Sequence, residues 1–422
     1  MPSSNSTTYS PRLPEGFKFL ILLRIAIIEL PILSYYSSSI INGIMVFLIV
    51  ILTISYLGHS FKYYLSLILP LTIITITDYV FGFISGRNVQ SIVLFLYGIL
   101  QFLIWPLALI AIIKSGDFKF AKTLLIFFLF CYIITGVTTY IGCGLFPGAS
   151  RALAAAYAQN EFEIINLYRQ YNIGGFDFIY CLVLFVPLSI FVIKNKIVVF
   201  NRMKLLIWVL LLGSLFVIIK SEYFTAIMLY SVSFICFLFT NNTTSKRFWT
   251  IIILCILFIV VFISFIPVLF SNLSSLTESK ILSNRFEDIG SILSGGNATS
   301  GDKDTEGRIN LYLTSWQAFL SSPIIGTGKN GGGHSFILDY MAKYGLVGVL
   351  LEIYLFSKIF KFSIKPFFNT VSYPFILFAF MLQIIMAFLN PMIFYNFFMF
   401  ILPLFACVSE PQCTERFVAM KR

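Results

Sequence analysis

The sequence predicts an all-α polytopic membrane protein, and its composition and apolar content support this fold class. Of the 422 residues, 59% are hydrophobic, 18% aromatic and only 11% charged. This charged share is less than half of what soluble globular domains carry, so the composition excludes a water-soluble enzyme. Since a membrane-spanning helix needs about 20 apolar residues, the apolar content suffices for about twelve spans and their connections. We therefore expect a single integral membrane domain over residues 1–422.

Apolar runs of span length recur along the chain. The first run is too long for the apolar core of a signal peptide and contains Glu29 and Pro31, so we expect it to be retained as a span. The twelve predicted spans lie at roughly 17–37, 39–57, 63–84, 91–113, 121–141, 175–193, 203–219, 222–240, 249–270, 334–357, 372–390 and 392–408.

If successive spans cross the membrane in alternate directions, the basic residues are distributed unequally between its two sides. With the N-terminus inside, 18 Lys or Arg residues fall on the inner side and 9 on the outer side, while Arg24 and Lys343 lie within spans. Short inner connections rich in Lys and Arg are typical of the cytoplasmic side, so both termini are predicted to be cytoplasmic. The net charge is +11, but the Lys and Arg residues form no basic block in a polar segment. We therefore expect no nucleic-acid partner.

Two outer connections are long, at residues 142–174 and 271–333, and the larger one ends in an informative segment. Apolar residues at 309, 312, 313, 316, 319 and 320 have helical spacing, and Pro323 follows. We expect an amphipathic helix at the outer membrane surface with Arg308 in its first turn. The glycines at 331–333 would let backbone N–H groups approach a ligand, and His334 would begin the next span, where a helix N-terminus favours anions.

These features converge on a phosphate-bearing lipid headgroup, because a guanidinium group pairs with phosphate oxygens in a bidentate manner. Simpler interpretations exist for each residue. Arg151, Arg169 and Arg285 taken singly could be solvated side chains, and His334 could be a helix cap.

Two pairs of charges within the predicted spans are candidates for ion pairs or for a substrate path. Arg24 and Glu29 lie five residues apart in the first span, and Asp339 and Lys343 lie four residues apart on one face of the tenth.

The spacing Arg308-x7-Trp316-x6-Pro323-x2-Gly326-x-Gly328-x5-His334-x10-Gly345-x2-Gly348 resembles the signature of the O-antigen ligase and polymerase superfamily. Its members include the Wzy-type polymerases of O-antigen and capsular polysaccharide repeat units. The sequence departs from the family pattern at Ser335, where the family commonly has Asn. It also departs at Lys220-Ser221, where the ligases usually have Ser-Arg.

The resemblance implies polymerisation of undecaprenyl-diphosphate-linked oligosaccharide repeat units on the outer face of a bacterial inner membrane, in lipopolysaccharide or capsule biosynthesis. Such a glycosyltransferase would move the donor glycan to a hydroxyl of an acceptor sugar. Its partners would be the lipid-linked donor and acceptor. A chain-length regulator and a flippase are possible protein partners. The alternatives are an O-antigen ligase that transfers polysaccharide to lipid A core and a lipid-linked oligosaccharide flippase.

The same resemblance assigns roles to particular residues. Arg308 would hold the diphosphate with help from Arg151, Arg285 or Lys220, and His334 would be the base or would orient the acceptor. No cofactor or metal is expected, because no Cys/His cluster with ligand spacing occurs in an outer loop. Asp302, Asp304 and Glu306 cluster in the larger loop, and we interpret them as solvated.

Overall fold

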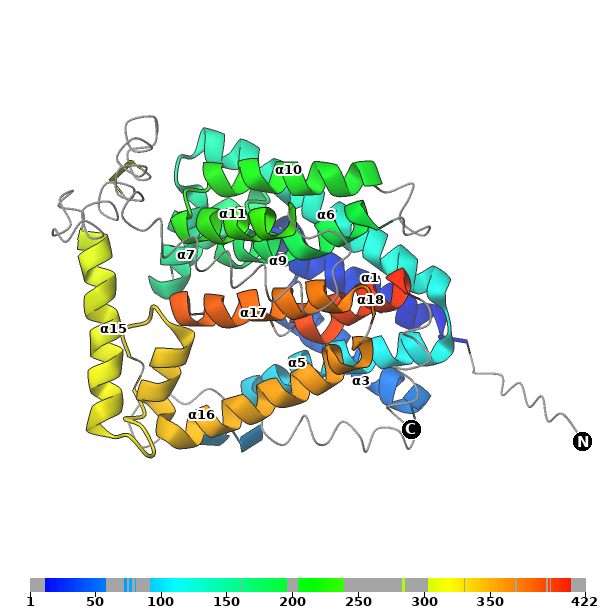
Figure 1. The fold of residues 1–422 in the computed structure, drawn as a ribbon. Helices are drawn as coiled ribbons and strands as arrows, with labels where there is room; N and C mark the ends of the chain where they lie inside the picture. Colours follow the sequence, from blue (N-terminus) through cyan, green and yellow to red (C-terminus); the bar gives the residue numbers. More distant parts are fainter. Residues whose placement is uncertain are drawn as a thin grey trace, which may run out of the picture.

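The computed structural model describes residues 12–57, 92–159, 161–195, 204–238, 303–329, 331–368, 370–391 and 396–410, with residues 72–73, 76–77, 80, 283–284 and 394 between them. Within these ranges, the side chains of residues 39, 92–96, 99, 102, 158–159, 236–238 and 303–309 are outside the description. All regular elements in this part of the chain are helices (Figure 1). They are α1 (Glu15–Glu29), α2 (Pro31–Tyr36), α3 (Ser39–Leu57), α5 (Ile92–Ser115), α6 (Phe118–Leu145), α7 (Ala149–Gln159), α8 (Phe162–Gln170), α9 (Phe176–Lys194), α10 (Lys204–Lys220), α11 (Phe224–Leu238), α15 (Lys303–Ser321), α16 (Phe336–Ser363), η3 (Lys365–Phe367), α17 (Tyr373–Leu389), η4 (Phe397–Ile401) and α18 (Leu402–Ser409).

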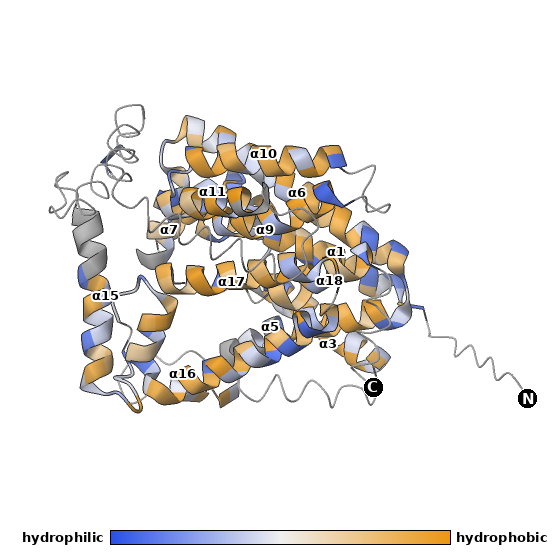
Figure 2. Cartoon of the chain, viewed as in Figure 1, coloured by the Kyte–Doolittle hydropathy of each residue, from blue (hydrophilic) through white to orange (hydrophobic). Residues whose placement is uncertain are grey.

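Three helices in the described residues are long and apolar enough to cross a membrane, namely Ile40–Leu57, Phe118–Leu145 and Phe176–Lys194. Further apolar helices are shorter, including Phe224–Ile235 and Tyr373–Leu389. Figure 2 shows that hydrophobic residues dominate the long helices. This helix-rich architecture fits a membrane protein. The number of twelve spans stays a prediction, since 249–270 and most of 63–84 lie outside the described residues.

The first predicted span is divided in two. Helix α1 ends at Glu29, Leu30 is extended, and Pro31 begins α2. Proline lacks the N–H that would continue the helix but fits the first helical position, which explains this break. The last predicted span also differs from a plain helix, because it begins as the π-helix η4 before α18.

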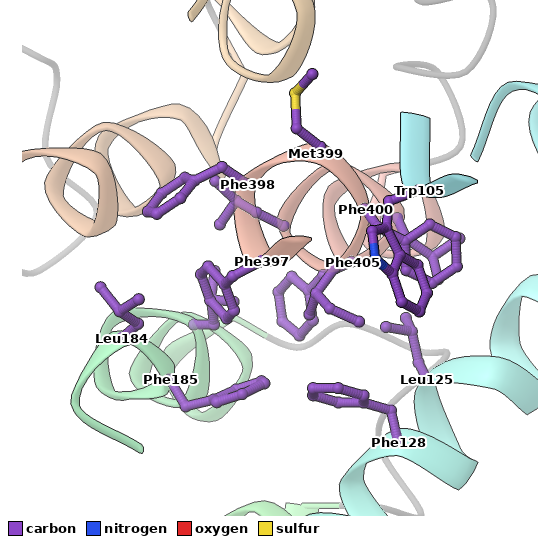
Figure 3. Packing of buried hydrophobic residues seen from close by; sticks show 14 of the residues in the cluster. Trp105, Leu125, Phe128, Leu184, Phe185, Phe397, Phe398, Met399, Phe400 and Phe405 are labelled. Carbon is purple, nitrogen blue, oxygen red and sulfur yellow. The ribbon is translucent and has the colours of Figure 1, made fainter. Parts of the chain in front are cut away.

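The centre of the bundle is formed by η4 and α18, whose residues are almost completely buried. Figure 3 shows their aromatic side chains between α5, α6 and α9. The ring of Phe400 lies 5.0 Å from that of Trp105, and Phe397 meets Phe185 edge to face at 5.2 Å. Aromatic pairs in these geometries stabilise a core beyond the area that they bury. The C-terminal helices therefore join the N-terminal half of the chain into one hydrophobic core.

Contacts at the helix ends group the connections into two sets. At one end, Lys18 of α1 lies 2.8 Å from Asp117, and the backbone N–H of Ser372 donates to Glu410 at the end of α18. At the other end, the N–H of Ile32 donates to the side chain of Asn172, and that of Phe336 donates to the carbonyl of Asn390. Each set joins segments that the predicted alternation places on the same side. The orientation of the two ends relative to the cytoplasm stays a prediction from the basic residues.

The outer loop predicted at 142–174 contains two helices, α7 and α8, that the search for span-length apolar runs did not detect. Helix α7 is alanine-rich, and alanine has the highest intrinsic helix propensity. The turn that follows α8 is fixed to the bundle by Asn172, which has a φ of 55°. Its side chain accepts from the N–H of Ile32 at 3.0 Å and donates to Thr138 at 2.9 Å. This loop is therefore a folded part of the bundle.

We predict that Asp117 stabilises the end of the bundle where it meets Lys18. Burial pushes the pKa of Asp117 up, but hydrogen bonds from Lys18 and from the N–H of Phe120 outweigh burial and hold this pKa below its ordinary value. A carboxylate with a lowered pKa contributes stability above its unfolded pKa of about 3.9 and loses it as the pH falls through the folded value. Asp117→Ala, which also removes the helix cap of α6, should cost about 1 kcal/mol at neutral pH.

Thermal unfolding of the detergent-solubilised protein measures this effect. Asp117→Asn retains a capping oxygen and should lose less stability than Asp117→Ala. The difference between wild type and either variant should shrink below pH 4, roughly the ordinary aspartate pKa. A difference that grows in acid would contradict the assignment.

Candidate functional site

The segment with the spaced glycines folds as a docked loop between α15 and α16. In Figure 1, α15 runs across one end of the bundle, beside the start of α16. Helix α15 extends from Lys303 to Ser321 and includes the helix predicted from Arg308 to Phe319. The Tyr312 hydroxyl donates to the carbonyl of Leu389, so α15 also contacts the end of α17.

Two glycines of the spacing pattern face each other where the loop meets α16. Gly345 interrupts α16 with φ 62° and ψ −159°, a conformation accessible almost only to glycine. The N–H groups of Leu346 and Val347, freed by this interruption, donate to the carbonyls of Pro323 and Ile324. A Cβ on Gly345 would lie 2.4 Å from the carbonyl oxygen of Ile324, and one on Gly326 2.3 Å from that of Lys343. Close backbone packing therefore explains these two glycines.

We predict that Gly345→Ala destabilises the protein by about 3 kcal/mol or more, because it adds backbone strain and a clash with a carbonyl oxygen. The measurement is the melting temperature and the yield of monodisperse protein in detergent. Gly144→Ala in α6 is the matched control, since its added Cβ would meet nothing within 4 Å and the helix has an ordinary conformation there. Equal stability of the two variants would refute the packing explanation.

The glycines at 331–333 are held by Ser315 and Asp339. The Ser315 hydroxyl donates to Asp339 Oδ1 at 2.6 Å and accepts from the N–H of Gly332 at 2.7 Å. Asp339 also accepts from the N–H groups of Gly333 and Ser335. The expectation that this backbone binds a ligand is thus wrong for Gly332 and Gly333, because both N–H groups already have partners within the protein.

These hydrogen bonds also bear on the predicted pairing of Asp339 with Lys343. Both oxygens of Asp339 accept from the loop and from Ser315, while the Lys343 ammonium lies 4.9 Å from the ring centroid of Tyr344. Asp339 therefore fastens the loop to α16. The loop ends at His334, directly before Ser335, the N-cap residue of α16. The position of His334 is set by this network.

His334 lies on the wall of a large cavity of about 1190 Å³. The cavity reaches into the bundle, since Gly98, Gln101 and Trp105 on successive turns of α5 all line it. Elements distant in sequence surround it, from α1 to η4. Its polar and aromatic lining includes Arg24, Glu29, Gln101, Trp105, Tyr132, Arg151, Tyr157, Arg169, Asp177, Tyr223, His334, Asn390 and Asn396.

Three arginines reach this cavity from different helices. Arg151 of α7 and Arg169 of α8 are both half-buried. The Arg169 Nε donates to the Tyr157 hydroxyl at 2.9 Å, and its guanidinium lies 5.4 Å from the centroid of that ring. This contact holds the Arg169 side chain in place. Arg24 of α1 is only 6% exposed.

Arg24 and Glu29 do not form the pair that was a candidate from the sequence. The Arg24 Nη1 donates to Asn42 Oδ1 at 2.8 Å, while its buried Nε has no hydrogen-bond partner. Asn390, which is 4% exposed on the same cavity, also has an unpartnered buried Nδ2. A buried donor without an acceptor costs free energy, and both of these residues line the same cavity.

The cavity also contains two carboxylates, Glu29 at the end of α1 and Asp177 in the first turn of α9. The Tyr132 hydroxyl lies close to the Glu29 side chain. Thr135 donates to the carbonyl of Glu29 at 2.6 Å, which fixes the end of α1 against α6. Cations, carboxylates and aromatic rings thus surround the same space.

Of the residues predicted for the site, Arg151 and His334 meet at the cavity. Lys220 lies exposed in the last turn of α10 and is not among the lining residues. Arg308 lies in α15, one turn before Tyr312, and its side chain is outside the described residues, as is the whole of Arg285. From the sequence, Arg24 and Glu29 are candidates only for an ion pair or a substrate path. Arg169 is a candidate for a solvated side chain, and Asp177 is not among the predicted residues.

No group of three or more His, Cys, Asp or Glu residues in the described part of the chain could hold a metal ion. Asp302 lies outside the described residues, as do the side chains of Asp304 and Glu306. A scan against protein-family models found no matching family, and a search of curated proteins found no match.

Proposed function

We propose that this protein polymerises undecaprenyl-diphosphate-linked oligosaccharide repeat units into O-antigen or capsular polysaccharide. The reaction would take place at the outer face of a bacterial inner membrane. The observation that carries the proposal is the cavity, where Arg24, Arg151 and Arg169 meet His334. Guanidinium groups bind phosphate oxygens strongly and stay charged when buried, which suits a diphosphate at a membrane surface.

The remaining lining fits a glycan attached to such a diphosphate. Carboxylate and amide groups, including Glu29 and Asn390, can hydrogen-bond sugar hydroxyls, and rings such as Trp105 offer apolar faces to pyranose rings. A volume of about 1190 Å³ exceeds what a single phosphate needs and accommodates sugar units beside it. The site is therefore suited to a phosphate-linked oligosaccharide.

In this reaction the diphosphate is already a good leaving group, so the protein mainly has to neutralise the charge that develops on it. The cavity arginines and Arg308 would supply the positive charge that neutralises the diphosphate. Arg285 and Lys220 are further candidate cations of the outer segments. His334 would act as the base or orient the acceptor hydroxyl. No metal is required for this chemistry, and we expect polymerisation to persist in the presence of EDTA.

Deletion of the gene separates the proposed polymerase from its alternatives. Without a polymerase, capping with single units can continue, so a gel of surface glycans should show single repeat units on the core in place of a ladder of chain lengths. A ligase deletion would remove even the single unit while lipid-linked polymer accumulates. Loss of a flippase would leave the lipid-linked unit on the inner leaflet. Only the first pattern supports the proposal.

We predict that the connection at 271–333 faces the periplasm or cell exterior. A cysteine introduced at Ser294, which lies outside the described residues, should react with a membrane-impermeant maleimide in intact cells whose outer membrane has been made permeable. The control is a cysteine at Ser115, the last residue of α5, which should react only after lysis. The reverse pattern would overturn both the orientation and the proposed outer site.

A further inference from the structure

The two carboxylates of the cavity have no role in binding a diphosphate, because their charge would repel it. Glu29 is half-buried and Asp177 is accessible from the cavity. Neither forms an ion pair with an arginine of the described residues. Carboxylates inside a membrane bundle are costly and rare, and they are candidates for a function by default. Because Glu29 and Asp177 line the same cavity as Arg24, we consider a role for them in the chemistry.

The end of the helix on which each carboxylate lies distinguishes the two. Glu29 is the last residue of α1, where the negative end of the helix dipole favours uptake of a proton. Asp177 lies in the first turn of α9, at the positive end of that helix. Glu29 is therefore the carboxylate whose place in its helix favours accepting a proton.

Arg24 and Glu29 come from the same helix and line the same cavity. The two residues lie five positions apart on α1, which corresponds to about 7.5 Å along the helix axis. If Arg24 holds the diphosphate, the donor sugar and the attacking hydroxyl lie in the same cavity as Glu29. A general base must reach that hydroxyl to within about 3 Å.

We infer that Glu29 accepts the proton of the acceptor sugar's hydroxyl, an inference that rests on the proposed polymerase function. The hydroxyl oxygen forms a bond to the anomeric carbon of the donor, and the bond from that carbon to the diphosphate oxygen breaks. Its electron pair leaves with the undecaprenyl diphosphate, whose charge the arginines neutralise. The hydroxyl proton passes to the Glu29 carboxylate, beside which the Tyr132 hydroxyl lies. His334 then orients the acceptor.

The test compares variants in membrane vesicles, with lipid-linked repeat units extracted from the deletion strain as substrate. Glu29→Gln should lower the turnover number about 10³-fold, which is within the range of general-base catalysis. The KM for the lipid-linked unit should stay within about threefold, since the donor is bound by the arginines. Glu29→Asp should recover part of the rate. Asp177→Asn should lose less than Glu29→Gln, and Glu163→Gln, an exposed carboxylate of α8 away from the cavity, should be unaffected.

The pH profile provides a readout that a structural role would not change. The acid limb of the wild-type rate should disappear from the residual activity of Glu29→Gln and persist in His334→Gln. The titratable or charged groups around Glu29 are Arg24, Cys131, Tyr132, Asp177 and Cys181. Cys131→Ala and Cys181→Ala should retain the wild-type profile, which excludes the thiols as the source of that limb.

Folding and donor binding are measured separately with purified protein. Glu29→Gln should match wild type in melting temperature and in its affinity for undecaprenyl diphosphate. Three results for Glu29→Gln would each overturn the inference and leave the polymerase function intact. They are a turnover above a tenth of wild type, a KM that rises by as much as the turnover falls, and an unchanged acid limb. A wild-type protein that forms no polymer from the extracted lipid would overturn the proposed function itself.

Discussion

Arg308→Ala should abolish the polymer ladder, with a loss of about 10³-fold in polymerisation rate at normal protein level. The variant removes a cation that we place at the diphosphate, and a methyl group cannot replace it. Helix α15 supports this placement, because Tyr312, one turn further along, contacts the carbonyl of Leu389 directly before the cavity residue Asn390. Arg308→Lys should recover little, since an ammonium group lacks the bidentate fork.

The control for Arg308 is Lys329→Ala, which removes another cation of the same outer segment. Lys329 is exposed and is not among the cavity residues, so its loss should leave the ladder nearly normal. Polymer length distributions on gels and the amount of protein in the membrane are measured together. A normal ladder from Arg308→Ala would show that the diphosphate is held elsewhere.

Arg24→Gln should reduce polymerisation at least about 10²-fold, because it removes the most buried cation of the cavity. The glutamine amide can still donate to Asn42, so the contact between α1 and α3 is retained. Stability should be unchanged or slightly higher, because a buried charge without a carboxylate partner is costly. Affinity of the purified variant for undecaprenyl diphosphate should fall in parallel with the rate.

Lys18→Gln is the matched control on the same helix. Lys18 is the other basic residue of α1 and contacts Asp117 at the opposite end of the bundle. Its replacement should lower the melting temperature modestly and leave the rate unchanged. If Arg24→Gln keeps wild-type affinity for undecaprenyl diphosphate and a normal ladder, Arg24 is a structural residue and the cavity does not bind the diphosphate at that point.

The site could be predicted only in part. The sequence singled out His334 and Arg151, and both lie at the cavity. From the sequence we also expected the glycines at 331–333 to form a ligand-binding backbone. In the structure the N–H groups of Gly332 and Gly333 donate instead to Ser315 and Asp339. A glycine permits close approach of any group, and spacing alone does not show whether that group is a ligand or the protein's own helix.

The sequence by itself determined which segments are helical in most of the described chain. Apolar runs at 121–141 and 175–193 correspond to α6 and α9, because the apolar length needed to cross a bilayer is a local property of the chain. The same local criterion missed α7 and α8, whose helices are short and mixed in polarity. Proline positions, such as Pro31, further determined where helices begin and end.

The tertiary structure alone decided which side chains share a space. Arg24, Arg151, Arg169 and His334 are separated by as many as 310 positions, from 24 to 334, yet all line one cavity. No periodicity encodes this meeting, because it depends on how α1 and α7 pack against α6 and how α8 packs against α2. The separation of Arg24 from Glu29 follows for the same reason: Asn42 on a neighbouring helix supplies the acceptor that the sequence could not place.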